Sequence, residues 1–186
     1  RKTKAKLIYA GSSTKFGDQG LNANESPYAW SKSSNTLLVN NYAKWFNINY
    51  AIVYFYNAYG VREINEGKYA TLIALFTQKM KNNLPLTVVK PGTQRRNFTH
   101  VKDIVRGLVL VSNKGQGDGY CIGNKESFSI IEVAEKFGGE IQFLKERKGN
   151  RLDAEINTIQ LENLGWKVKE NLFNYIEEVK MNNWEL

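Results

Sequence analysis

Short apolar segments alternate with longer segments of helical pattern, and this alternation limits the fold more than any other feature of the chain. Residues 48–57 are rich in β-branched and aromatic side chains, and 6–13 is a short apolar run that ends in a small-residue turn, so both are expected to be buried strands. Between them, 27–46 opens on Pro27 and spaces its apolar residues as a helix does. Strands that alternate with helices are typical of α/β proteins with parallel pairing, so the sequence predicts that class.

The same alternation continues to the end of the chain. Pro85 ends one predicted helix, and Pro91 and Gly92 form a turn after the next strand. No repeat, low-complexity tract or obvious linker interrupts the pattern. The further elements expected are helices at 69–83, 102–112 and 129–137, strands at 86–89, 119–123 and 140–144, an extended piece at 97–101 and two terminal helices.

Composition excludes several other classes of protein. The 186 residues are 42% hydrophobic and 24% charged, which fits a globular domain and not a disordered, collagen-like or coiled-coil chain. Because Cys121 is the single cysteine, we expect neither an intrachain disulfide nor a metal site built on thiolates. The apolar runs are too short to span a bilayer, and no leader peptide opens the chain. The expectation is a cytoplasmic protein that does not bind membranes.

The charge balance indicates an anionic partner. Lys and Arg total 26 against 18 Asp and Glu, which gives a formal net charge of +8. A basic protein of this kind suits a nucleic acid, an anionic surface or a phosphorylated small molecule. No nucleic-acid-binding motif surrounds the three basic groups at 1–6, 94–97 and 145–151. We therefore expect a phosphorylated small molecule and no nucleic acid.

Three side chains suggest proton-transfer chemistry. Tyr28 and Lys32 have the i, i+4 spacing that puts both on one helix face, although a surface pair with no function has the same spacing. Ser12 ends a predicted strand, and open α/β sheets bind ligands at the carboxyl ends of their strands. A nearby ammonium favours the phenolate form of a tyrosine. Tyr28 would then take a proton from a substrate hydroxyl, while Ser12 holds that oxygen in line.

The sequence resembles the extended short-chain dehydrogenase/reductase family, in its NAD-dependent nucleotide-sugar epimerase/dehydratase branch. The likeness covers nearly all of the chain and is closest to the UDP-glucose 4-epimerases of that branch. It rests on six segments that occur in the family's order, namely IYAGSSTKFGD at 8–18, PYAWSK at 27–32, VYFYNAYG at 53–60, QRRNFTHVKDIVRGL at 94–108, YCIGN at 120–124 and RKGN at 147–150.

The resemblance implies catalytic and cofactor-binding residues. By position, Ser12 matches the family's catalytic serine or threonine, and Tyr28 matches its catalytic base. Lys32 matches the lysine that assists this tyrosine and bonds the nicotinamide ribose of NAD. Tyr56 and Asn57 fall on the family's aromatic-Asn turn, which implies an NAD contact for Tyr56 and a nucleotide-sugar contact for Asn57.

The resemblance also implies residues that bind the nucleotide. Arg96 and Arg147 match two arginines that would clamp the diphosphate with charge-assisted hydrogen bonds. Asn150 stands where the family has an aspartate that faces the nucleotide ribose, and Asn97 replaces a second aspartate. The implied substrate is a nucleotide sugar, most simply a UDP-sugar.

The implied fold is the C-terminal part of a Rossmann-like parallel sheet plus a small α/β substrate-binding domain. The likeness begins at about the family's fifth strand, and no Gly-x-Gly-x-x-Gly turn for the cofactor's diphosphate occurs in the sequence. We expect residues 1–60 to form a partial NAD-binding portion and 61–186 to be mainly substrate-binding, with some elements returning to the sheet. The helix with Tyr28 and the one at 69–83 match the family's dimer-forming pair, which implies a homodimer.

Three functions remain open at this point. The first is an NAD-dependent epimerase acting by reversible hydride transfer at the sugar C4. The second is a non-catalytic fragment that holds a nucleotide sugar, because the strand at 6–11 lacks its usual neighbours and the chain alone is expected to turn over little. The third is a reductase or dehydratase of the same fold. His100 is expected to pack or cap a helix, and Asp103 to cap or open the helix at 102–112.

Overall fold

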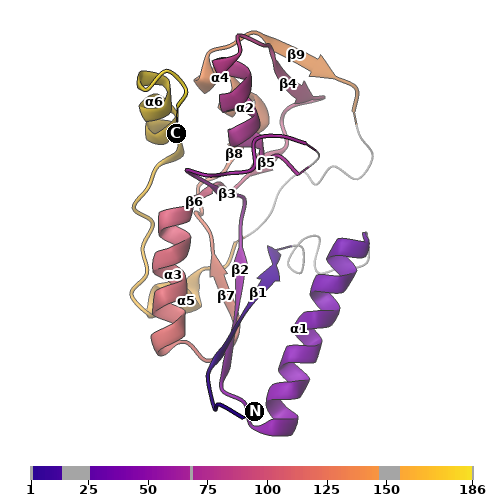
Figure 1. The fold of residues 1–186 in the computed structure, drawn as a ribbon, viewed down its shortest axis with the longest axis vertical. Helices are drawn as coiled ribbons and strands as arrows, with labels where there is room; N and C mark the ends of the chain where they lie inside the picture. The colour runs from indigo at the N-terminus through magenta and orange to yellow at the C-terminus, as the bar shows by residue number, and fades with distance from the viewer. Residues whose placement is uncertain (1, 14–25, 68, 147–155, 186) are drawn as a thin grey trace.

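The computed structural model describes residues 2–13, 26–67, 69–146 and 156–185. Its central feature is a three-stranded parallel sheet of order β1-β2-β7, made of β1 (Leu7–Ser12), β2 (Tyr50–Phe55) and β7 (Gly117–Ile122). Helix α1 (Pro27–Phe46) covers one face, and α3 (Val101–Lys114) and α5 (Ile159–Asn163) lie on the other (Figure 1). The predicted α/β class with parallel pairing is therefore confirmed.

A second group of elements packs beyond the carboxyl ends of these strands (Figure 1). It contains the parallel pair β4 (Leu86–Val89) and β9 (Ile141–Leu144), with α2 (Leu72–Lys81), α4 (Ile130–Phe137) and α6 (Leu172–Met181). Phe76, Leu86, Phe137 and Ile176 are at most 1% exposed in its core. Two short pairs join the groups: β3 (Ala58–Tyr59) with β6 (Thr99–His100), and β5 (Arg95–Arg96) with β8 (Phe128–Ser129).

The strand register brings three segments to one edge of the sheet. Ser12 at the end of β1 pairs with Phe55 at the end of β2, and Phe55 pairs with Ile122 at the end of β7. Since the strands are parallel, whatever follows each of them starts at the same edge. Residues 117–122 return to pair beside β2, so part of the chain after residue 60 belongs to this sheet.

Helix α1 has the bounds expected from its sequence. Ser26 caps its start by accepting a hydrogen bond from the Ala29 amide, and Pro27 occupies the first turn, where its missing N–H costs nothing. The helix ends at Asn47 in the left-handed conformation. It buries only three residues and exposes a series of large apolar ones. The exposed series is Tyr28, Trp30, Leu37, Leu38, Tyr42, Trp45 and Phe46.

Helix α3 is held by buried polar groups at its start. His100 Nδ1 accepts a hydrogen bond from the Lys102 amide, which confirms the capping role expected for this histidine. Asp103 lies in the first turn with no exposed surface, pairs with Arg106 and accepts hydrogen bonds from the amides of Lys169 and Glu170. Asp103 therefore connects the segment before α6 to helix α3. The N-terminal cap of α3 is His100 and not Asp103.

The other predicted elements differ from the observed ones mainly at their ends. The helix expected at 69–83 is α2 over Leu72–Lys81, and the strand expected at 86–89 has the same bounds as β4. The extended piece expected at 97–101 contains β6, whereas the two-residue strands β3, β5 and β8 are not apparent in the sequence pattern. Within the described ranges, no helix is long and apolar enough to cross a membrane.

Candidate functional site

Of the three residues with predicted proton-transfer roles, Ser12 lies at the carboxyl edge of the sheet, and Tyr28 and Lys32 belong to helix α1. Ser12 is the last residue of β1, and Tyr28 stands in the first turn of α1, whose start lies near that end of the strand (Figure 1). Lys32 is half-buried, and its ammonium donates a 3.1 Å hydrogen bond to the carbonyl of Ala10, two residues before Ser12. The ammonium also lies 5.6 Å from the centre of the Tyr9 ring. Lys32 is thus directed toward the end of β1.

Tyr28 remains open to solvent at this edge. Its side chain is 59% exposed, and it follows the cap residue Ser26 by two positions. With Lys32 one helical turn further along, the two functional groups project from the same side of α1. The proton-transfer roles of Ser12, Tyr28 and Lys32 stay predictions.

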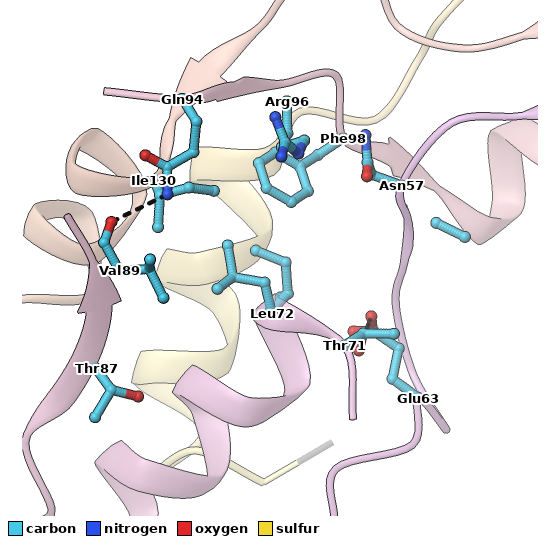
Figure 2. A pocket seen from close by; sticks show the side chains of 12 residues that line it. Asn57, Glu63, Thr71, Leu72, Thr87, Val89, Gln94, Arg96, Phe98 and Ile130 are labelled. Atoms are coloured by element: carbon cyan, nitrogen blue, oxygen red, sulfur yellow. Dashed lines mark hydrogen bonds between the residues drawn. The ribbon is translucent and has the colours of Figure 1, made fainter. Parts of the chain in front are cut away.

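A cavity of about 450 Å³ brings together two residues with predicted roles in substrate binding. Asn57 follows the end of β2 and Arg96 belongs to β5, and both line this cavity (Figure 2). Asn57 lies two residues beyond Phe55, the register partner of Ser12, so the cavity adjoins the edge described above. Leu72, Val89 and Ile130 supply an apolar side to the same cavity (Figure 2).

The alternation of an extended segment explains why Arg96, and not Arg95, faces the cavity. Gln94, Arg96 and Phe98 all line it, as expected where successive side chains point to opposite sides. Gln94 is 4% exposed, and its amide donates a 3.1 Å hydrogen bond to the Val89 carbonyl, which joins two segments of the wall (Figure 2). The Arg96 guanidinium donates to the carbonyl of Arg95 at 2.7 Å.

The alternate residues of this segment have structural partners. Arg95 donates a 3.0 Å hydrogen bond from Nε to the hydroxyl of Ser127 and lies 3.3 Å from a carboxylate oxygen of Glu132. Asn97 is buried and donates to the carbonyls of Lys125 and Glu126. A carboxylate could not donate these two bonds, which gives a local reason for asparagine where the family resemblance has aspartate.

Glu63 is a lining residue that the sequence pattern does not reveal. Its carboxylate accepts a 2.6 Å hydrogen bond from the Thr71 hydroxyl and a 3.2 Å bond from the Gly60 amide. Burial raises the pKa of Glu63, while these two donors act in the opposite direction. Glu63 lies in a loop without regular periodicity, so only its position shortly after Asn57 could have suggested it.

Three further residues with predicted roles are Tyr56, Arg147 and Asn150. Tyr56 is 1% exposed, packs against the α1 side of the sheet, and donates its hydroxyl to the sulfur of Cys121 at 3.6 Å. Its NAD contact therefore stays a prediction, and the observed role is packing beneath the edge. Arg147 and Asn150 lie outside the residues that the structure describes.

Comparison with known proteins identifies the family. The sequence profile described as the NAD dependent epimerase/dehydratase family matches residues 1–123. The chain belongs to this family. A putative UDP-glucose 4-epimerase of Methanocaldococcus jannaschii is 30% identical over 167 residues, covering 85% of this chain and 54% of that protein. The mouse dTDP-D-glucose 4,6-dehydratase is 26% identical over 202 residues, covering 96% of this chain and 55% of that protein.

A solved structure supports the same assignment. The UDP-glucuronic acid 4-epimerase of Bacillus cereus, in complex with UDP-glucuronic acid and NAD, superposes with a TM-score of 0.80 at 26% identity. The match covers 92% of this chain and 59% of that one. The chain therefore has the Rossmann-like α/β fold of the family, and it spans little more than half the length of these relatives.

Proposed function

We propose that this chain carries the catalytic and sugar-binding part of an NAD-dependent nucleotide-sugar epimerase that acts at the sugar C4, as a UDP-glucose 4-epimerase does. The observation that carries the proposal is the cavity lined by Asn57 and Arg96 beside the strand edge toward which Lys32 is directed. Relatives of this family include an epimerase and a dehydratase of nucleotide sugars, so family membership alone leaves the choice between them open.

The proposed chemistry uses three side chains of this chain. Tyr28 takes the proton of the C4 hydroxyl and later returns one to the same oxygen. The Lys32 ammonium stabilises the phenolate, and Ser12 holds the oxygen in line with a hydrogen bond. Reversible hydride transfer at C4 is the chemistry that bound NAD would supply, with Lys32 holding its nicotinamide ribose. Inversion at C4 requires that the sugar ring can turn, so this chain would hold the substrate mainly through its diphosphate.

Two of the substrate contacts that we propose, Asn57 and Arg96, lie on the cavity wall. The Arg96 guanidinium would bind the diphosphate, joined by Arg147 from the later segment, because forked donors match phosphate oxygens. Asn57 would bond the sugar nucleotide near the diphosphate, and Asn150 the nucleotide ribose. The apolar side at Leu72 and Val89 would then receive the base.

The residues present fit one end of NAD. The Lys32 ammonium is half-buried and donates to the Ala10 carbonyl at 3.1 Å, and we propose that it also bonds the ribose hydroxyls of NAD at the strand edge. Tyr28 beside it is 59% exposed and adds a hydroxyl to the same donor set. The cavity lined by Asn57 and Arg96 also supports a second candidate, a nucleotide-sugar-binding module that holds its ligand without turnover.

The proposal also covers the oligomeric state, the division of the chain and the compartment of the protein. We propose a homodimer, with residues 1–60 serving mainly the cofactor and 61–186 mainly the substrate. The exposed aromatic and aliphatic series along α1, which includes Trp30 at 59% and Trp45 at 65% exposure, supports an association surface there. We also propose that it acts in the cytoplasm, where Cys121 stays a buried thiol.

Calorimetric titration with UDP tests the cavity assignment. We expect UDP to bind, and Arg96→Ala to weaken the affinity about 10-fold to 100-fold through the loss of a charge-assisted hydrogen bond. Arg95→Ala is the matched control, because that guanidinium bonds Ser127 and Glu132 on the other side of the segment. Equal loss in both variants, or no UDP heat at all, contradicts the site.

Conversion of UDP-glucose to UDP-galactose in the presence of NAD separates the two candidates. Turnover that falls at least about 100-fold in Tyr28→Phe supports the epimerase, because a positioned acid–base group contributes that much. UDP binding without turnover supports the binding module.

A further inference from the structure

The side of α1 that rests on the sheet carries a row of polar residues at a spacing of four. Lys32 donates to the Ala10 carbonyl of β1 at 3.1 Å, and the Asn40 amide donates to the Asp118 carboxylate of β7 at 3.3 Å. Between them, Thr36 is 2% exposed, donates its hydroxyl to the Lys32 carbonyl at 2.9 Å and lies beside the Tyr54 hydroxyl of β2. The row therefore contacts all three strands of the sheet.

Tyr54 and Asp118 form the centre of this network. Tyr54 is fully buried and donates its hydroxyl to Asp118 Oδ1 at 2.5 Å. Burial and then the adjacent carboxylate raise the pKa of Tyr54 far above its ordinary value, so its hydroxyl remains a donor. Asn40 in turn accepts a 2.8 Å hydrogen bond from the Tyr50 hydroxyl. One carboxylate thus connects a strand tyrosine to the second half of α1.

The Tyr54 ring extends this network to β1. A Cβ on Gly11 would lie 2.5 Å from the Tyr54 ring, so the absence of a side chain at Gly11 allows the ring to sit beneath β1. Gly11 stands between Ala10, which accepts the Lys32 hydrogen bond, and Ser12. The ring is therefore packed against the strand end where the proposed proton chemistry takes place.

Apolar packing alone would fix the rotation of α1 poorly. Besides Thr36, the buried residues of the helix are Ala29 and Ala43, which have little side chain to interlock with the sheet. Hydrogen bonds to buried groups are directional and costly to leave unmade, so they define the helix position more sharply. A turn of the helix by one residue, about 100°, would move Lys32 away from the sheet.

We propose that Tyr54 and Asp118 are positioning residues that hold α1 in the rotation that directs Lys32, and with it Tyr28, to the end of β1. The catalytic importance of this helix rotation rests on the proposed function. The positioning of α1 by Tyr54 and Asp118 does not depend on that function, because it concerns only how the helix lies on the sheet.

Lysine acylation followed by mass spectrometry tests the proposal on the unliganded chain. In Tyr54→Phe, the loss of one hydrogen bond should speed acylation of Lys32 by about threefold to tenfold. Lys44, exposed in the last turn of α1, should react at an unchanged rate. Tyr120→Phe is the matched control, because this buried tyrosine of the neighbouring strand bonds Gln116 on the α3 side.

If the side chains around position 54 rearrange in Tyr54→Phe, a second pair of variants at Asp118 still tests the proposal. Asp118→Asn retains the acceptor for Tyr54 but loses the one for the Asn40 amide, so Lys32 reactivity should rise less than in Asp118→Ala, which removes both acceptors. UDP affinity should stay unchanged in all folded variants, since Arg96 lies on another segment. Unchanged Lys32 reactivity in both Tyr54→Phe and Asp118→Ala overturns the proposal, as does an equal rise in Tyr120→Phe. Because no ligand is used for the labelling, failure of the proposed function would not alter its outcome.

Discussion

Helices α1 and α3 lie on opposite faces of one three-stranded sheet, and they are held there by different means. Helix α3 buries Ile104, Gly107 and Val111 against the sheet, together with the fully buried Asp103. Helix α1 buries two alanines and a threonine, is fixed by polar contacts to the strands, and leaves its large apolar residues uncovered. The proposed proton chemistry belongs to the α1 face of the sheet, where a few hydrogen bonds set the geometry. We expect contacts on the α3 face to contribute most of the free energy of unfolding.

The largest effect is expected on the α3 side. Asp103→Ala removes the acceptor of the Lys169 and Glu170 amides and the partner of Arg106, and should lower the free energy of unfolding by about 3–5 kcal/mol. Urea denaturation followed by circular dichroism measures this change. The partly exposed ion pair between Arg106 and Glu170, 3.6 Å apart, provides the control. Glu170→Gln should cost less than about 1 kcal/mol, and a similar loss in both variants would contradict the comparison.

A smaller effect is expected where α3 touches the sheet most closely. A Cβ at Gly107 would lie 2.9 Å from two side-chain carbons of Ile122, so Gly107→Ala should destabilise the fold by about 1–3 kcal/mol. Thermal unfolding of the variant checks this. Gly67→Ala, at a glycine with nothing within 4 Å of the added carbon but a φ of +74°, separates overpacking from backbone strain.

Helix α1, the short strands and the cavity residues show how much of the structure the sequence could predict. The periodic pattern and Pro27 predicted α1 with its observed bounds, because both signals are local. The two-residue strands β5 and β8 depend on a pairing between residues more than thirty positions apart, which no local pattern encodes. The family resemblance predicted Arg96 and Asn57, which share the cavity. It did not predict Glu63, or the contact between Tyr54 and Asp118, because their partners are set by the tertiary fold.

His100 provides a pH-dependent test of the α3 face. Burial lowers the pKa of His100, with nearby Glu170 and Asp103 acting against this and Lys102 and Arg106 acting with it. The unfolded chain therefore binds a proton more readily below about pH 6.5 than the folded chain does, and this histidine reduces stability as the pH falls from 7 to 5. His100→Asn keeps a capping acceptor and should lose less stability over that interval. Parallel pH profiles of urea midpoints for the two proteins would contradict this.

The smallest effect on folding is expected on the exposed side of α1. Trp45 is 65% exposed, so Trp45→Gln should change the free energy of unfolding at low protein concentration by no more than about 0.5 kcal/mol. If the proposed homodimer forms through α1, the same variant weakens it, and sedimentation velocity across a concentration series measures the loss. A dimer that persists unchanged in Trp45→Gln would place the association surface elsewhere.

The paired arginines of β5 have a consequence for how this segment tolerates change. Arg96 faces the cavity and Arg95 faces away toward Ser127, because neighbouring side chains of an extended strand alternate. A slip of β5 by one position against β8 would exchange the two guanidiniums and still leave one at the cavity. An insertion or deletion that changes the parity of this strand would therefore keep one positive charge on each side, with Arg95 toward the cavity and Arg96 toward the side of Ser127 and Glu132.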